Sequence, residues 1–267
     1  MALVPVDDLS DPRIADYRNL PDAELLRDRA IFIAEGRLVV RRLLTSSRFR
    51  ARSVLVTPPA YDSLRDLLDT VELPVFVASQ ALLNDITGFN IHRGCLAIAE
   101  RGSPLDWRTL TAASRLVLIE QVANADNVGA IFRNAAAFGA DAILLESSST
   151  DPLYRKAIRT SMGAALWLPF ARLEPWPEAL TELRSGGTTL IGLTTDATQT
   201  IDVVVQRVRH RNIGLLLGHE GNGLTAHAQE ACDHLARIPM AHGVDSLNVA
   251  TAAAVALYEL SRSSTVR

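Results

Sequence analysis

Three segments of this 267-residue chain combine polar side chains with glycine in patterns that could bind a ligand or catalyse a reaction. The first segment, residues 124–134, opens an expected helix and contains Asn127, Gly129 and Arg133. Asn127 could cap that helix, Gly129 lets another backbone approach closely, and Arg133 lies about one and a half turns later near the helix surface. A capped helix with a solvated arginine is the open alternative.

The second segment runs from Leu217 to Leu224 and places three glycines around Glu220, directly after an apolar stretch. Glycines at this density indicate unusual backbone conformations or a closely approaching ligand. The segment matches neither the GxGxxG pattern of dinucleotide-binding folds nor the GxxxxGK[ST] pattern of phosphate-binding loops, so we set NAD and ATP aside. Alternatively, Glu220 is an acidic residue at the start of a helix that begins near Leu224.

The third segment, residues 238–257, leads through Ser246 and Asn248 into an alanine-rich helix. Either residue could be no more than the cap of that helix. The small side chains allow the helix to pack very close to other backbone. His242 has no second histidine or cysteine at metal-binding spacing, so we expect a surface position for it and no metal site.

The elements that position these segments alternate between strand and helix from Ser114 onward. Strands that are apolar throughout indicate a parallel sheet covered by helices on both faces. Ligands of such sheets usually bind where loops leave the carboxyl ends of the strands. The expected strands are 116–120, 142–145, 189–193, 213–217 and 235–238, and the expected helices are 128–138, 153–163 and 247–260.

An acidic lead-in at residues 1–20 precedes a smaller predicted α/β unit. In that unit, helical spacing covers 22–33, 38–44 and 61–70, and brief apolar strands cover 53–57, 75–77 and 95–99. Residues 101–106 combine glycine, serine, proline and charge, which is typical of a linker. We therefore expect one domain at 21–103 and a second at 113–267.

The composition, with 48% hydrophobic and 21% charged residues, excludes a disordered chain, a collagen and a coiled coil. Cys95 and Cys232 belong to no CxxC pair, which argues against a disulfide framework and a zinc site. The sequence has neither a signal-peptide pattern nor an apolar run long enough to cross a membrane, so we expect a cytoplasmic protein.

A net charge of −3 means that any nucleic-acid binding must come from a local patch. One candidate is the arginine cluster, Arg37, Arg41, Arg42, Arg48, Arg50 and Arg52, which spans sixteen residues without Asp or Glu. The cluster could bind phosphates, and the alternative is a solvated helix flank.

Taken together, the three segments resemble the signature motifs of the SpoU (TrmH-like) branch of the SPOUT RNA 2′-O-ribose methyltransferases. The motifs match in order at 127–133, 218–224 and 238–248, and the resemblance extends from Leu116 to the C-terminus. The earlier part, with residues 32–36 before the arginine-rich helix and His92, Arg93 and Gly94 before a strand, is similar to the L30e-like substrate-binding domain of many family members.

The resemblance implies a parallel sheet with a trefoil knot in which S-adenosylmethionine binds bent, after a smaller L30e-like domain. It places the cofactor against Leu217, Gly218, Gly223, Ile238, Met240, Ser246 and Leu247. It also implies a catalytic site of Asn127, Arg133, Glu220, Ser246 and Asn248. Because a guanidinium stays protonated, we hypothesise that Arg133 binds the adjacent phosphate and stabilises developing alkoxide.

The resemblance further implies a homodimer and an RNA substrate, with neither metal nor membrane involved. The L30e-like part favours structured ribosomal RNA over transfer RNA, with Arg37, Arg41, Arg42 and Arg48 as candidate contacts. Three alternatives stay open: a transfer-RNA 2′-O-methyltransferase, an enzyme that modifies another atom such as a base nitrogen, and a non-catalytic RNA-binding scaffold.

Overall fold

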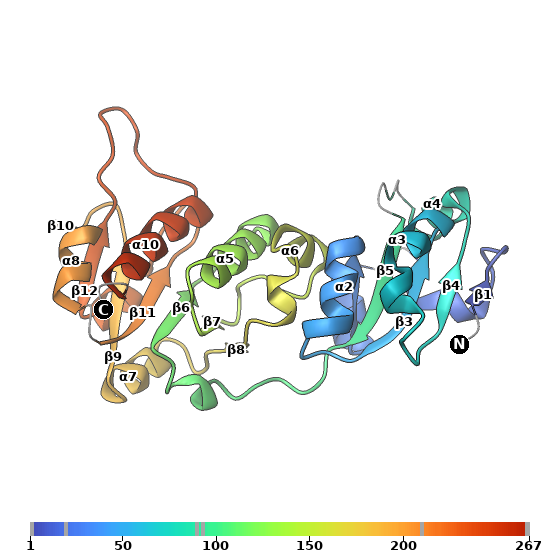
Figure 1. Cartoon of the computed structure of the whole chain (residues 1–267). Helices are drawn as coiled ribbons and strands as arrows, with labels where there is room; N and C mark the ends of the chain where they lie inside the picture. The colour runs from blue at the N-terminus through green and yellow to red at the C-terminus, as the bar shows by residue number, and fades with distance from the viewer. Residues whose placement is uncertain (1–2, 19–20, 89–90, 92–93, 209–210, 265–267) are drawn as a thin grey trace. The chain divides into compact units, whose positions relative to one another are not determined.

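The computed structural model describes residues 3–18, 21–88, 91, 94–208 and 211–264 (Figure 1). The chain forms two compact units. Unit 1 comprises Met1–Ser103 and Pro152–Trp167, and unit 2 comprises Pro104–Asp151 and Leu168–Arg267. The first division falls within the predicted linker, whereas the return of residues 152–167 to unit 1 has no counterpart in the sequence pattern.

Unit 1 contains a mixed five-stranded sheet in the order β1-β4-β3-β5-β2. β5 is antiparallel to both of its neighbours, and the other pairs are parallel. The strands are β1 (Leu3–Pro5), β2 (Ile31–Glu35), β3 (Ala51–Val56), β4 (Val75–Val77) and β5 (Cys95–Glu100), and the helices are α1 (Asp22–Asp28), α2 (Arg37–Ser46), α3 (Pro58–Leu68) and α4 (Gln80–Thr87).

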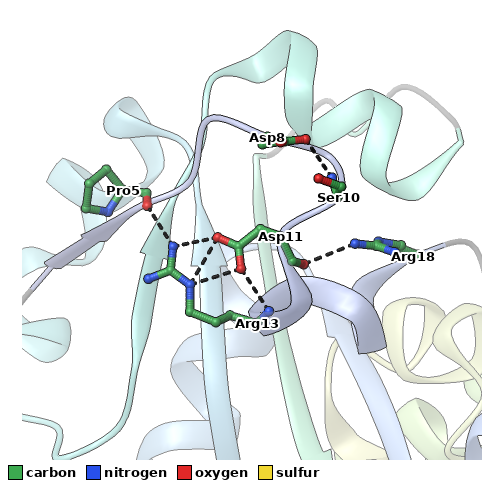
Figure 2. Close-up of polar contacts among 6 residues, drawn as sticks. All are labelled: Pro5, Asp8, Ser10, Asp11, Arg13 and Arg18. Carbon is green, nitrogen blue, oxygen red and sulfur yellow. Dashed lines mark hydrogen bonds and ion pairs between the residues drawn. The ribbon is translucent and has the colours of Figure 1, made fainter.

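The acidic lead-in is part of this unit. β1 pairs with β4, and Ile14 and Tyr17 of the 3-10 helix η1 (Pro12–Tyr17) are buried in the hydrophobic core. Figure 2 shows the polar contacts that hold the segment. Asp11 caps η1 by accepting from the backbone N–H of Arg13 at 2.9 Å and pairs with its guanidinium, while Arg18 donates to the Asp11 carbonyl at 3.1 Å.

The helix predicted over 22–33 is wrong beyond Asp28. The helical C-cap is Arg29, Ala30 adopts φ +51°, and β2 begins at Ile31. A positive φ at a non-glycine residue breaks the helix, and the following β-branched and aromatic side chains are fully buried in the sheet. The apolar residues of 31–33 therefore belong to a buried strand, which helical spacing does not distinguish over so short a run.

Unit 2 contains a seven-stranded sheet in the order β10-β12-β9-β11-β6-β7-β8, and every pair in it is parallel. The predicted parallel sheet is thus confirmed. Its strands are β6 (Arg115–Ile119), β7 (Ala142–Leu145), β8 (Phe170–Arg172), β9 (Thr188–Leu193), β10 (Gln199–Thr200), β11 (Asn212–Leu217) and β12 (His234–Arg237).

Helices cover both faces of this sheet, as predicted. One face packs Leu118 and Leu216 against residues of α7 and α9, such as Leu180 and Ala228. α5, α8 and α10 cover the other face, and α5 and α10 lie side by side (Figure 1). These helices are α5 (Ala125–Ala137), α7 (Glu178–Ser185), α8 (Ile201–Val208), α9 (Ala226–Ala231) and α10 (Val249–Ser264). The threading that would make a knot stays a prediction.

The helix predicted over 153–163 is shorter, because α6 covers only Arg155–Thr160. Met162 and Gly163 both have positive φ, and a short 3-10 helix, Ala164–Leu166, follows. This segment is tied to unit 1 where Arg155 donates to the Asp22 carboxylate at 2.9 Å. Among the described residues, no helix is long and apolar enough to cross a membrane.

Candidate active site

The three polar segments meet at the carboxyl ends of β6, β11 and β12 in unit 2, around two adjoining hollows. The glycine-loop cavity, of about 330 Å³, lies along residues 217–223. The asparagine cavity, of about 430 Å³, lies over Asn124, Asn127 and Asn248. Both are in the size range of small-molecule sites. Four residues line both cavities and so join them: Glu220, Ser246, Leu247 and Val249.

All seven residues assigned to the cofactor by resemblance line the glycine-loop cavity. They are Leu217, Gly218, Gly223, Ile238, Met240, Ser246 and Leu247. Besides the two segments that contain these residues, a third segment that was not predicted from the sequence lines the cavity: Leu193, which ends β9, and Thr194, Thr195 and Asp196, which follow it. β9 is the sheet neighbour of β11, so its carboxyl end opens on the same edge. The predicted strand at 189–193 was the available signal, but strand order cannot be deduced from its pattern.

The glycine loop, residues 218–223, is closed on itself. The backbone N–H of His219 donates to the Gly223 carbonyl at 3.0 Å, and the Gly223 N–H donates back to the His219 carbonyl at 3.0 Å. A Cβ on Gly218 would lie 2.3 Å from the carbonyl carbon of Gly223, so only glycine fits there. The missing side chain at Gly218 therefore lets the two ends of the loop approach each other closely.

A hydrogen-bonded chain of three side chains runs along the asparagine cavity. The Asn127 amide donates to the Glu220 carboxylate at 2.8 Å, and its oxygen accepts from the Asn248 amide at 2.9 Å. The Asn248 oxygen accepts in turn from the backbone N–H groups of Ala250 at 2.9 Å and Thr251 at 3.3 Å. Asn248 thus caps α10 and also belongs to the site, so the two interpretations of this residue are compatible.

Glu220 is held as a carboxylate by its surroundings. Burial raises its pKa, but hydrogen bonds from the Asn127 side chain and from the backbone N–H groups of Asn124 and Ala123 outweigh burial and lower the pKa from its ordinary value of 4.5. Those N–H groups lie at the start of α5, where a negative charge is stabilised. The carboxylate therefore does lie at a helix N-terminus, but at that of α5 and not of the helix after Leu224.

The expected cap of α5 needs correction. Asn124 is the N-cap and accepts from the Asp126 N–H at 2.8 Å, whereas Asn127 lies within the first turn. The interior position frees the Asn127 amide to point across to Glu220 and Asn248.

Four of the five expected catalytic residues come together, and the fifth lies apart. Asn127, Glu220, Ser246 and Asn248 all line the asparagine cavity. Arg133 is exposed on α5, and it is absent from the described linings of both cavities. Six residues along a helix correspond to a rotation of about 240°, so Arg133 and Asn127 occupy different faces.

Glu120 is a further residue that supports the loop. Its carboxylate is fully buried at the end of β6 and accepts from the Thr225 N–H at 2.9 Å, the Thr225 hydroxyl at 2.6 Å and the Trp176 indole N–H at 3.0 Å. These bonds fix the chain where it leaves the glycine loop. In the sequence, the signal for this role is that Glu120 is a charged residue at the end of an otherwise apolar expected strand.

The charges around the glycine-loop cavity suit a cationic ligand. Asp196 and Glu220 line it, and none of its described lining residues is Lys or Arg. S-adenosylmethionine carries a sulfonium, so the residues present fit this cofactor. Within the described part of the chain, no group of three His, Cys, Asp or Glu side chains could hold a metal ion, and His242 is exposed.

The arginine cluster lies in unit 1, on α2, on β3 and on the residues between them. Arg37 is exposed at the start of α2, and Arg41 donates to both oxygens of Asp66 at 2.8 and 2.9 Å. The guanidinium carbon of Arg48 lies over the Phe49 ring, 4.7 Å from the ring centroid. Arg42 packs beside Gly163, and Arg50 and Arg52 each lie 4.0 Å from Glu100. Neighbouring acids therefore partly neutralise the cluster. His92 and Arg93 of the resemblance lie outside the described residues.

The chain is similar to known proteins along nearly its whole length. Residues 114–258 match the SpoU rRNA Methylase family. An uncharacterized tRNA/rRNA methyltransferase of Mycobacterium bovis is 41% identical over 264 residues, which is 97% of this chain and 91% of that protein. A tRNA/rRNA methyltransferase of Synechocystis is 38% identical over 158 residues, covering 58% of this chain and 56% of its own length.

Two solved structures extend the comparison to the fold. The AdoMet-bound rRNA methyltransferase from Sinorhizobium meliloti has a TM-score of 0.83 at 25% identity and covers 97% of this chain and 98% of its own. The SpoU methyltransferase AviRb from Streptomyces viridochromogenes, with a TM-score of 0.80 at 24% identity, covers 95% and 98% and shares the fold.

The family match spans more than half of the chain, and the mycobacterial relative spans nearly all of it. The cavity at the carboxyl ends of β9, β11 and β12 is the candidate cofactor site of such an enzyme. The chain belongs to the SpoU family of RNA methyltransferases, and S-adenosylmethionine is its methyl donor.

Proposed function

We propose that this enzyme methylates the 2′-hydroxyl of a ribose in structured ribosomal RNA. The observation that carries the proposal is the chain from Glu220 through Asn127 to Asn248, which lies next to the glycine-loop cavity. It offers fixed polar groups to a sugar in the asparagine cavity, with the cofactor in the neighbouring cavity.

Methyl transfer to a hydroxyl is an in-line displacement, so the protein must chiefly hold the two reactants in line. When bound, the cofactor supplies an electrophilic methyl group on its sulfonium. Ser246 and Glu220 line both cavities and stand where the ribose would meet that methyl group. The amides of Asn127 and Asn248 already have fixed orientations, so little ordering is needed when the ribose binds.

Arg133 has a separate role in this proposal. Its guanidinium binds the phosphate next to the target ribose and stabilises the oxygen as negative charge develops. Its exposed position on another face of α5 favours action in the active site of a partner subunit. The enzyme is then a homodimer in which each site takes Arg133 from the other protomer.

RNA docking is assigned to unit 1, where the arginine cluster would contact phosphates. The L30e-like resemblance and the rRNA activity for which the Sinorhizobium protein is named favour ribosomal RNA. Transfer RNA is the second candidate, because the mycobacterial relative is named for both substrates.

The first experiment is transfer of radiolabelled methyl from S-adenosylmethionine to separately purified, unmodified ribosomal and transfer RNA, followed by nucleoside analysis. We expect a 2′-O-methylated nucleoside from ribosomal RNA. Label only in transfer RNA would select the second candidate. Label on a base, or cofactor binding without transfer to either RNA or to assembled ribosomal subunits, would contradict the proposed reaction.

Subunit mixing tests the role of Arg133. Arg133→Ala and Asn248→Ala homodimers should both be inactive, and co-refolding them should restore up to about a quarter of wild-type activity, because half the dimers are mixed and each has one intact site. Arg133→Lys should stay weak, since an ammonium lacks the planar fork. No recovery from co-refolded dimers would place Arg133 in its own subunit's site.

A further inference from the structure

The side chain of His219 folds back into the glycine loop. Its Nδ1 atom accepts from the backbone N–H of Gly221 at 2.8 Å and from that of Asn222 at 3.2 Å. Both donors belong to residues that line the glycine-loop cavity, as does His219 itself. The imidazole therefore hydrogen-bonds to the backbone of its own loop, at two residues that line the cavity.

This contact requires one form of the imidazole. A nitrogen that accepts hydrogen bonds carries no proton, so in the neutral ring the proton is on Nε2. Together with the two backbone bonds between His219 and Gly223, Nδ1 gives residues 219–223 four internal hydrogen bonds. The loop shape is thus set by the side chain as well as by its glycines.

The loop shape matters because Glu220 is the next residue. Its carboxylate must reach the Asn127 amide at 2.8 Å and the N–H groups of Ala123 and Asn124. The backbone from Gly218 to Gly223 must at the same time form one wall of the cofactor cavity. Any rotation of the peptide units after Glu220 would disturb both.

We propose that His219 is a positioning residue, which through its unprotonated Nδ1 holds the glycine loop in the conformation that binds S-adenosylmethionine and aims Glu220 at Asn127. It touches neither reacting atom in this role. The inference rests on the proposed function of the site, but its main readout is cofactor binding, which does not depend on which RNA is methylated.

The geometry suggests an isosteric test. The Oδ1 atom of asparagine stands at the same number of bonds from the backbone as Nδ1 of histidine, and it accepts from N–H groups two and three residues later in ordinary turns. Glutamine carries the same amide one methylene further away. His219→Asn therefore keeps the acceptor in place, His219→Gln displaces it, and His219→Ala removes it.

We expect His219→Asn to bind S-adenosylmethionine within about twofold of wild type, and His219→Ala and His219→Gln to bind at least about tenfold more weakly, as the loss of two hydrogen bonds implies. Calorimetric titration of the full-length chain with S-adenosylmethionine measures this. His227, exposed on α9, supplies the control His227→Ala, which should bind like wild type. Thermal unfolding of each variant checks that the fold persists.

The kinetic split adds a second readout. Because Glu220 is misdirected as well, His219→Ala and His219→Gln should lower kcat at saturating cofactor and not only raise KM, while His219→Asn restores both. Equal affinities for all variants, or an asparagine variant no better than the glutamine one, would overturn the proposal. If His219→Ala does not fold, the asparagine and glutamine pair decides alone. Cofactor binding by wild type without methyl transfer would count against the proposed function only.

Discussion

The candidate active site of unit 2 and the arginine cluster of unit 1 use polar side chains in opposite ways. In the site, Asn127 donates to Glu220 and accepts from Asn248, so neighbouring side chains fix one another. In the cluster, Arg41 donates to Asp66, which is not a member of the cluster, and Arg37 is exposed to solvent. The proposed chemistry on a ribose requires fixed directions, whereas the proposed attraction of phosphates acts over several ångströms and tolerates motion.

The largest loss of activity is expected when the hydrogen bond between Asn127 and Glu220 is replaced by repulsion between two negative charges. Asn127→Asp replaces the amide donor by a carboxylate that faces Glu220, and the two like charges repel. Removal of a single fixed donor in an active site costs about 10²- to 10³-fold in rate, and we expect at least this loss of kcat. Single-turnover methyl transfer at saturating cofactor measures it.

Asn134→Asp is the matched control, because Asn134 lies on the same helix and its amide donates to the Ala250 carbonyl at 2.8 Å outside both cavities. It should lower the melting temperature by a few degrees, about what one lost hydrogen bond implies, with little loss of kcat at a temperature where the variant is folded. If both variants lose the same activity, the polar chain has no special role.

This contrast also explains what the sequence could and could not predict. The sequence could predict a candidate site because the types and spacing of its motif residues resemble those of a known family, and all seven residues predicted to bind the cofactor line one cavity. Which of these residues bond to one another could not be predicted, because the Glu220–Asn127 bond joins residues 93 positions apart and depends on strand order. The cap was misassigned for the same reason: Asn124 and Asn127 are equally good caps until Glu220 is in place.

The pattern of polar and apolar residues gave a wrong prediction where every side chain of a segment is buried. Residues 31–33 are apolar without a gap, so a helical and a strand interpretation fit equally, and the positive φ of Ala30 is not visible in its side chain. The arginine cluster was visible as composition, but the pairing of Arg41 with Asp66, 25 residues later, depends on α2 lying beside α3. The sequence therefore predicted the positive charge of the cluster, but not that nearby carboxylates partly neutralise it.

An intermediate effect is expected from the arginine cluster. Replacing Arg41, Arg42 and Arg48 by alanine should weaken RNA binding about tenfold at physiological salt and reduce the salt slope by up to about 0.9 for each phosphate that is no longer bound. Asp66→Asn should have the opposite sign and strengthen binding about two- to threefold, because it frees the Arg41 guanidinium. Filter binding at several salt concentrations measures both.

Asp62→Asn is the control for this change of sign. Asp62 is on the same helix α3 and pairs with Arg65 at 2.5 Å, so its replacement removes the same charge without freeing an arginine of the cluster. Equal gains from Asp66→Asn and Asp62→Asn would mean that net charge alone governs affinity. No change of affinity or salt slope in the triple variant would exclude the cluster from RNA binding.

The smallest effect is expected from the titration of Glu220. Its pKa is lowered in the folded chain, chiefly by the Asn127 amide and nearby backbone N–H groups against the opposing effect of burial. Below the ordinary value of 4.5 the unfolded state therefore binds more protons, and this part of the stability is lost as the pH falls through the folded-state pKa. Glu220→Gln should flatten the fall of the unfolding free energy on acidification, measured by urea denaturation from about pH 6 to about pH 3.

Asn127→Ala should also flatten this fall of the unfolding free energy, since it removes the main side-chain donor to Glu220. Because Glu220 is exposed to solvent, the difference should be small, and a slope as steep in Glu220→Gln as in wild type would show that the bonds to Glu220 orient the carboxylate without stabilising its charge.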